Sequence, residues 1–302
     1  MPLFAFRSRH GKQKETNFLD APPEWAPAPE TSHTLGLYNE ATDDEYESAE
    51  RFCEHYPVDQ PKLLPSDIVE RIESEGCKAW KLEWPRSPRF VGHVEDTGEK
   101  GGNSAVSVMS KKECRDTCLF SDLPILAGLY DIQGKSGVYY EVVVHKMEGI
   151  IAIGTACRPY PEWRFPGWNR LSAGLHLDDM RKFFEDPDGG RDYSPLLNHI
   201  SPGDTIGCGY DFARSCIFYT HNGQRLSDAF TGIYVPRTSY DVYAAIGVEG
   251  NCKFDVNFGG ELFRWKEGNE WSWRVEGHVG RLSGGSGIGG DELPTYDEVR
   301  RR

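Results

Sequence analysis

The chain has 302 residues, of which 27% are charged, 38% hydrophobic and 12% aromatic, and it contains 33 Gly and 19 Pro. This composition is typical of one large, loop-rich β-domain with polar tails and excludes a helical bundle. Lysine and arginine number 34 against 47 acidic residues, a formal net charge of −13, and no basic stripe compensates for it. A nucleic-acid partner is therefore excluded.

The eight cysteines could be read as a disulfide framework, but no signal peptide precedes them and no Asn-x-Ser/Thr site occurs. We therefore expect reduced thiols in an intracellular protein. The longest apolar run, residues 138–156, is interrupted by Glu141, His145, Lys146 and Glu148. We expect no transmembrane segment, because a spanning helix needs about 20 mostly apolar residues.

Four regions follow along the chain. Residues 1–60 combine prolines with an acidic run at 40–54 that holds seven carboxylates and one arginine, and they are predicted to be mostly disordered, with a short helix in the acidic part. Residues 61–79 form a lead-in whose short helix opens at Pro65-Ser66 and ends at Gly76. Residues 80–266 are the folded β-domain, and residues 267–302 are a flexible tail with a Gly/Ser linker at 283–290.

Within 80–266, short apolar runs are separated by turn residues, which favours an antiparallel β-sandwich. Strands at 138–144 and 150–155 are predicted to meet at a Glu148-Gly149 turn. Strands at 243–248 and 253–258 are predicted to flank a second turn at 249–251. Strands at 205–212 and 215–220 lead to the strong tight-turn signal His221-Asn222-Gly223.

Six segments in this region resemble the SPRY domain family. They are residues 137–142 (Gly-Val-Tyr-Tyr-Glu-Val), 153–154 (Ile-Gly), 166–168 (Pro-Gly-Trp), 203–209 (Gly-Asp-Thr-Ile-Gly-Cys-Gly), 217–223 (Ile-Phe-Tyr-Thr-His-Asn-Gly) and 256–259 (Val-Asn-Phe-Gly). The Pro-Gly-Trp segment is similar to the RanBPM-like branch of the family. The resemblance implies an all-β, SPRY-type antiparallel sandwich that binds peptides or proteins through loops at one end.

The loop at 158–168 is rich in the residue types that dominate binding hot spots, namely Tyr160, Trp163, Arg164 and Trp168. We expect at least one of Tyr160, Trp163 or Arg164 to be an exposed contact for a client protein. Packing beneath a turn is the alternative for Trp168. Asp178-Asp179 and Arg181-Lys182 are interpreted as a solvated loop.

Near the C-terminus, Leu293-Pro294-Thr295-Tyr296 resembles the Leu-Pro-x-Tyr variant of the PY motif, the peptide motif bound by WW domains. A proline holds the extended polyproline II backbone that fits an aromatic groove, and the tyrosine reaches a second pocket. The WW-binding residues predicted here are Leu293, Pro294 and Tyr296. A chance pairing of Pro and Tyr in an ordinary tail is the alternative.

No enzyme motif in this sequence has the neighbouring elements or residues that its chemistry requires. Residues 285–290 satisfy G-x-G-x-x-G, but no strand precedes them and no helix follows, so they cannot present a helix N-terminus to a phosphate. Cys114 and Cys118 have a spacing that suits zinc, yet no second pair accompanies them. We expect no catalytic residues, no cofactor and no metal.

The whole arrangement resembles the fungal SPRY adaptors that recruit WW-domain HECT ubiquitin ligases to membrane-protein cargo. It implies a non-enzymatic adaptor with two partners, a client protein on the SPRY loops and a ligase on the tail, acting in ubiquitin-dependent sorting or turnover. The expected location is cytoplasmic, with peripheral attachment to endosomal or vacuolar membranes and a nuclear location left open. The alternative is a structural SPRY subunit of a multiprotein assembly, such as a chromatin methyltransferase complex.

Overall fold

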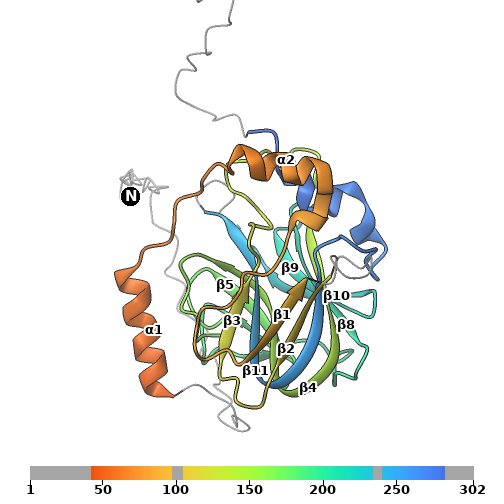
Figure 1. Ribbon diagram of the computed structural model, residues 1–302. Coiled ribbons are helices and arrows are strands. Elements are labelled where there is room, and N and C mark those ends of the chain that lie inside the picture. The colour runs from red at the N-terminus through yellow and green to blue at the C-terminus, as the bar shows by residue number, and fades with distance from the viewer. Residues whose placement is uncertain (1–41, 97–104, 234–239, 283–302) are drawn as a thin grey trace, which may run out of the picture.

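The computed structural model describes residues 42–96, 105–233 and 240–282 (Figure 1). Two α-helices, α1 (Asp43–His55) and α2 (Ser66–Glu75), precede a β-domain, with the short 3-10 helix η1 (Gly76–Ala79) after α2. The strands are β1 (Gly92–Asp96), β2 (Val106–Ser110), β3 (Thr117–Phe120), β4 (Gly137–Cys157), β5 (Ser172–His176), β6 (Arg181–Phe184), β7 (Arg191–Asp192), β8 (Thr205–Asp211), β9 (Cys216–His221), β10 (Gln224–Thr231) and β11 (Val242–Asn257). Every strand pairing is antiparallel.

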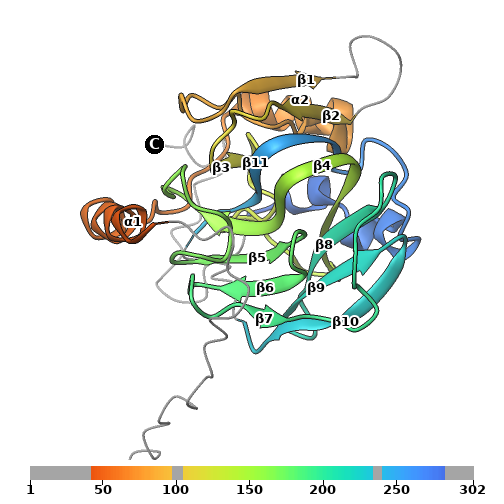
Figure 2. The same cartoon turned by 90° about the horizontal axis from the view of Figure 1, so that it is seen from below.

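The long strand β11 pairs along its whole length with residues 141–157 of β4, and both strands run through both layers of the domain. In the first layer, β3 adds to the start of β11, and β5, β6 and β7 follow the end of β4. In the second layer, β2 and β1 add to the end of β11, and β8, β9 and β10 follow the start of β4. Figure 2 shows β4 and β11 curving from one layer to the other. The arrangement confirms the predicted antiparallel sandwich.

The core lies between the two layers. The Tyr140 hydroxyl, in the first half of β4, donates a 2.7 Å hydrogen bond to the carbonyl oxygen of Gly154 in the second half. The two halves of β4 therefore lie in different layers and face each other across the core. Buried aliphatic and aromatic side chains from both layers fill the space, including Val142, Ile153, Ile206, Tyr219, Ile246 and Phe254.

The two turns predicted at Glu148-Gly149 and at residues 249–251 are wrong. Gly149 and Gly250 lie opposite each other in unbroken antiparallel pairing between β4 and β11. A Cβ atom at Gly149 would lie 2.2 Å from the carbonyl oxygen of Glu249, and Gly250 has φ +71°. These glycines bring two paired backbones close together within continuous strands, rather than reversing the chain.

Local turn and helix chemistry was predicted correctly elsewhere. Asn222 and Gly223 both have positive φ, 53° and 82°, as a tight turn between β9 and β10 requires. Helix α2 begins at Ser66 and is capped at Gly76, which has φ 60°. Helix α1 lies in the acidic segment for which a short helix was expected.

The chain after residue 266 differs from the predicted flexible tail, because residues 267–282 pack against the β-domain. The 3-10 helices η2 (Glu267–Asn269), η3 (Trp271–Trp273) and η4 (Val275–His278) follow one another, and Val275 is fully buried. Trp273 packs with Trp265, Tyr139 and Phe218. The aromatic side chains of this cluster bury apolar surface and so stabilise the segment, although its composition is typical of turns.

Candidate functional site

The loop between β4 and β5, residues 158–171, lies on the outer face of the first layer. Its Tyr160 ring packs with Cys118, Phe120 and Ala245 of the sheet. The Tyr160 hydroxyl donates to the carbonyl oxygen of Phe165 at 2.7 Å and so ties the loop to itself. The loop is therefore a packed layer of the domain.

This packing corrects the expectation of exposed loop contacts. Tyr160, Arg164 and Trp168 retain only 4%, 1% and 5% exposure. Trp168 stacks on Phe165 at 4.9 Å, and the Arg164 guanidinium lies 4.5 Å from the Trp168 ring centre. The Pro-Gly-Trp segment is thus packing beneath a turn, the alternative considered for Trp168.

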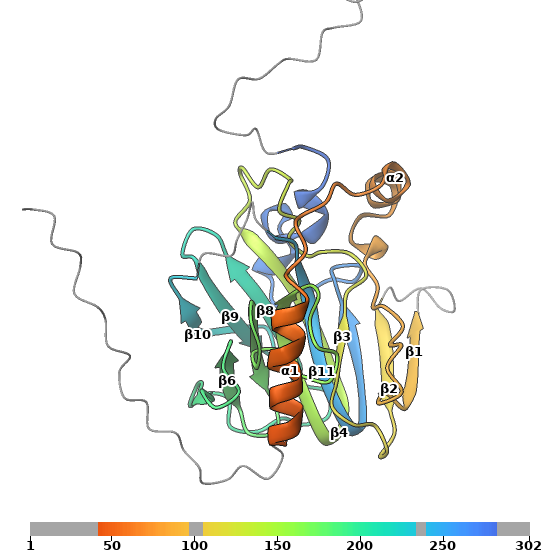
Figure 3. The same cartoon turned by 90° about the vertical axis from the view of Figure 1, so that its left-hand side faces the viewer.

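Trp163 is the one member of the predicted set that is half-buried, and helix α1 lies against it. The Trp163 indole meets the Phe52 ring edge-on at 5.7 Å and donates to the carbonyl oxygen of Glu45 at 3.3 Å. Figure 3 shows α1 in front of the β-domain, and Figure 1 shows it at one side of the domain. The loop that was expected to meet a client therefore meets a segment of the same chain.

Charge holds α1 in place. The Glu45 carboxylate lies 2.8 Å from the Arg89 guanidinium and 3.5 Å from that of Arg115. At the other end of α1, the Arg170 guanidinium donates to the carbonyl oxygens of Cys53 and Tyr56, groups that a helix C-terminus leaves without partners. We call Arg89, Arg115, Trp163, Arg164, Asn169 and Arg170 the α1-docking surface.

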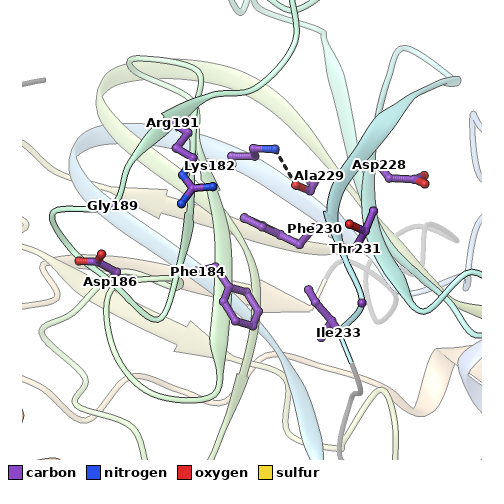
Figure 4. A pocket seen from close by; sticks show the side chains of 11 residues that line it. Lys182, Phe184, Asp186, Gly189, Arg191, Asp228, Ala229, Phe230, Thr231 and Ile233 are labelled. Carbon is purple, nitrogen blue, oxygen red and sulfur yellow. Dashed lines mark hydrogen bonds between the residues drawn. The ribbon is translucent and has the colours of Figure 1, made fainter. Parts of the chain in front are cut away.

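An open concavity lies where the β6–β7 edge of the first layer meets β10, the edge strand of the second layer. It measures about 760 Å³, and Figure 4 shows the side chains of β6, β7 and β10 around it. The residues that line it are Lys182, Phe184, Asp186, Gly189, Arg191, Asp228, Ala229, Phe230, Thr231, Gly232 and Ile233. We call this concavity the edge hollow.

The edge hollow combines aromatic and charged groups. The rings of Phe184 and Phe230 lie 5.3 Å apart, and Phe184 is 39% exposed. Lys182 donates to the carbonyl oxygen of Ala229 at 2.6 Å, which joins β6 to β10 across the gap between the layers. Partial burial lowers the pKa of Lys182. Such a surface suits a peptide that carries both apolar and charged side chains.

Sequence reasoning missed the edge hollow because residues 181–182 were interpreted as a solvated loop. They belong to strand β6, in which Lys182 and Phe184 are two positions apart and share one face. Side chains that alternate with a period of two could have indicated a strand here, but β6 has only four residues, which is too short for such a pattern to be recognised. Strand β10, which lies across the edge hollow from β6, is distant in sequence, so local patterns could not show that the two strands are close.

Leu293, Pro294 and Tyr296 lie outside the described residues, as do Gly285–Gly290. Cys114 and Cys118, the pair weighed as zinc ligands, are buried free thiols. Within residues 42–96, 105–233 and 240–282, no group of three or more His, Cys, Asp or Glu is arranged to hold a metal ion. In the same ranges, no helix has the length and hydrophobicity needed to cross a bilayer.

Comparison with known proteins assigns the domain. Residues 137–261 match the SPRY domain family. A "Protein ssh4" of Sclerotinia sclerotiorum is 29% identical over 269 residues, which is 86% of this chain and 46% of that protein. A SPRY domain-containing protein of Schizosaccharomyces pombe is 29% identical over 225 residues, 74% of this chain and 51% of that protein. A crystal structure of a human SPRY domain aligns with 52% of the chain at 22% identity and a TM-score of 0.40.

Residues 137–261 therefore form a SPRY domain, and SPRY domains are protein-interaction modules. The chain is homologous to fungal Ssh4 and to SPRY domain-containing proteins. The chain spans about half the length of these curated relatives.

Proposed function

We propose that this protein is a non-enzymatic adaptor that joins a client protein to a WW-domain HECT ubiquitin ligase, for ubiquitin-dependent sorting or turnover of the client. The homology of its SPRY domain to Ssh4 is the observation that carries the proposal. The Leu293-Pro294-Thr295-Tyr296 sequence supports it, because the motif comes after residue 282 in the sequence and so lies outside the described domain. Two modest contacts on one chain raise the effective concentration of the ligase at the client.

The client contact belongs to the edge hollow in this proposal. Tyr160, Arg164 and Trp168 are buried, so the predicted loop residues do not offer their side chains to a partner. Phe184 and Phe230 supply aromatic surface in the hollow, and aromatic side chains are enriched in interface cores. Charged groups of both signs, Lys182 and Asp228 among them, surround these rings and provide orientation.

The ligase contact is tested with the full chain and a panel of isolated WW domains. Tyr296→Ala should abolish binding, because the tyrosine ring fills the second WW pocket. Thr295→Ala is the matched control, since it alters the variable position of the motif and should retain micromolar binding. Equal WW binding by the Tyr296→Ala and wild-type chains would rule out recruitment through this motif.

The client contact is tested by cross-linking in cells followed by detection of ubiquitin on the captured protein. Phe184→Asp should lose the client but keep the ligase, whereas Tyr296→Ala should keep the client but lose its ubiquitylation. Leu196→Asp is the control, because Leu196 is 64% exposed and does not line the hollow. A stoichiometric partner whose level and modification ignore Tyr296→Ala would instead support the structural-subunit alternative.

A further inference from the structure

The surface beneath α1 gathers positive charge in a chain whose net charge is −13. Arg89 and Arg115 meet the first turn of α1, and Arg170 meets its last carbonyl groups. Arg164 reaches the centre of α1 through Asn169, which accepts from Arg164 at 3.0 Å and donates to the Glu50 carboxylate at 2.8 Å. Planar guanidinium groups suit carboxylates and helix-terminal carbonyls, so this surface is built for an acidic helix.

Helix α1 supplies what this surface requires. It carries Asp43, Asp44, Glu45, Glu47, Glu50 and Glu54 against a single Arg51. Its apolar contribution is small, because Ala49 is the only buried residue of the helix and Phe52 is half-buried against Trp163. The helix is held mainly by charge and hydrogen bonds, which salt and a competing acidic group both weaken.

Helix α1 leaves hydrogen-bond donors of the α1-docking surface without a partner. The Arg164 side chain is 1% exposed, yet its Nη1 atom has no hydrogen-bond partner among the described residues. A buried donor without an acceptor is destabilising, because it has lost its hydrogen bonds to water without replacing them. In addition, the charges of Glu45 and Asp116 repel each other, which helps to raise the pKa of Asp116. The surface therefore has two buried donors that α1 does not use, Arg164 Nη1 and Arg170 Nε, and it opposes one of the charges of α1.

We propose that the α1-docking surface is a second binding surface of this protein, specific for an acidic helix of a partner protein, and that α1 occupies it in cis until such a helix displaces it. The pattern on α1 defines the partner: carboxylates at positions i and i+5, a small residue at i+4 and an aromatic ring at i+7, as in Glu45, Ala49, Glu50 and Phe52. A partner that also places an acceptor beside Arg164 gains a hydrogen bond that α1 does not make. This proposal goes beyond the adaptor function and depends on neither the edge hollow nor the WW motif.

Cys53 offers a direct readout of docking in the full chain. It is the only one of the eight cysteines that is not buried, and its thiol lies on α1 near Arg170. The double variant Glu45→Arg/Glu50→Arg reverses both carboxylates that face the surface and should raise the labelling rate of Cys53 several-fold. The control Glu47→Arg/Glu54→Arg makes the same charge change at two exposed positions of α1 and should label like wild type.

Binding in trans tests the partner chemistry. The probe is a fluorescent peptide with the sequence of residues 42–57, titrated against full chains. The undocked variant Glu45→Arg/Glu50→Arg should bind it at least tenfold more tightly than wild type, because the tethered α1 competes at a high effective concentration. The exposed-face control should bind like wild type. Adding Arg170→Glu to the undocked variant should remove binding.

Several results would overturn the proposal. An unchanged Cys53 labelling rate in the undocked variant would show that charge does not hold α1. A freed Cys53 without peptide binding would make α1 a structural element only. A concentration-dependent dimer of the wild-type chain, with α1 exchanged between copies, would assign the surface to a second copy. Ala49→Glu undocks α1 by steric conflict and leaves every arginine intact, so it repeats the test if the charge variant does not fold.

Discussion

The hydroxyl of Tyr139 donates a 2.7 Å hydrogen bond to the carboxylate of Glu141, two positions along β4 on the outer face of the second layer. The same carboxylate accepts from the backbone amides of Arg264 at 2.8 Å and Trp265 at 2.9 Å. Glu141 is 3% exposed. A buried carboxylate thus fixes the C-terminal segment to the sheet, and the aromatic cluster of Trp265 and Trp273 excludes water from it.

Replacing Glu141 by Gln keeps the shape of the side chain but removes its charge and one acceptor. Hydrogen bonds to charged groups contribute about 1.5–3 kcal/mol each, so we expect Glu141→Gln to destabilise the protein by about 2 kcal/mol or more in denaturant unfolding. Glu148→Gln on the same strand is the control, because Glu148 is exposed and its ion pair with Lys146 is worth little. Equal losses in the two variants would contradict an anchoring role for Glu141.

The packing of the C-terminal segment is tested by two tryptophans that lie two residues apart. Trp273 is 8% exposed and meets Trp265 at 5.0 Å, whereas Trp271 is 61% exposed. Trp273→Ala should cost about 3–5 kcal/mol through lost burial and the cavity that remains. Trp271→Ala should cost at most about 1 kcal/mol, the value of its exposed contact with the Lys135 ammonium group. Similar unfolding midpoints for both variants would mean that the segment does not belong to the folded domain.

The glycine pair between β4 and β11 yields a further prediction. Gly149→Ala places a methyl group 2.2 Å from the carbonyl oxygen of Glu249, which backbone movement must relieve, and we expect a loss of about 2–3 kcal/mol. Gly134→Ala is the control: Gly134 also has positive φ, +78°, but a Cβ atom there meets nothing within 4 Å. Its cost should be about 1 kcal/mol. If urea unfolding gives the same loss for both, the strands do not need their close approach at Gly149.

Local chemistry explains which parts of the fold the sequence could predict. The Asn222-Gly223 turn and the Gly76 cap follow from a few adjacent residues that favour positive φ. Gly149 and Gly250 carry an equally strong local signal, but glycine serves both a chain reversal and a close approach of two strands. Only the distant pairing of β4 with β11 decides between them.

The buried loop shows the same limit for the candidate site. Tyr160, Arg164 and Trp168 have the composition of a binding hot spot, and composition does not distinguish an exposed loop from one that folds onto a sheet. The outer face of the first layer carries small residues, Ala152 and Gly247, and a Cβ atom at Gly247 would lie 2.6 Å from the Phe165 ring. The space that these small residues leave for the Phe165 ring can be recognised only when the pairing of β4 with β11 is known.

The last prediction concerns pH and the carboxyl group of Asp116. Burial, together with the nearby carboxylates of Glu249 and Glu45, raises the pKa of Asp116 from 3.8 to about 6, although Arg89 and Arg164 oppose this effect. The folded protein therefore holds this proton more tightly than the unfolded chain does. The stability gained from protonated Asp116 is fully present below about pH 4 and is lost as the pH rises through about 6.

Asp116→Asn keeps this side chain neutral at every pH. We expect the variant and wild type to unfold alike near pH 4, and the variant to be more stable by on the order of 2 kcal/mol above pH 6, because one pKa unit corresponds to about 1.4 kcal/mol. Thermal unfolding between pH 4 and 8 measures the difference, and Asp188→Asn at an exposed position is the control. The Cys53 labelling rate should fall in Asp116→Asn at pH 7.5, since a neutral side chain at this position no longer repels Glu45 and α1 docks more firmly. A stability difference that is constant over this pH range would show that Asp116 does not titrate beneath α1.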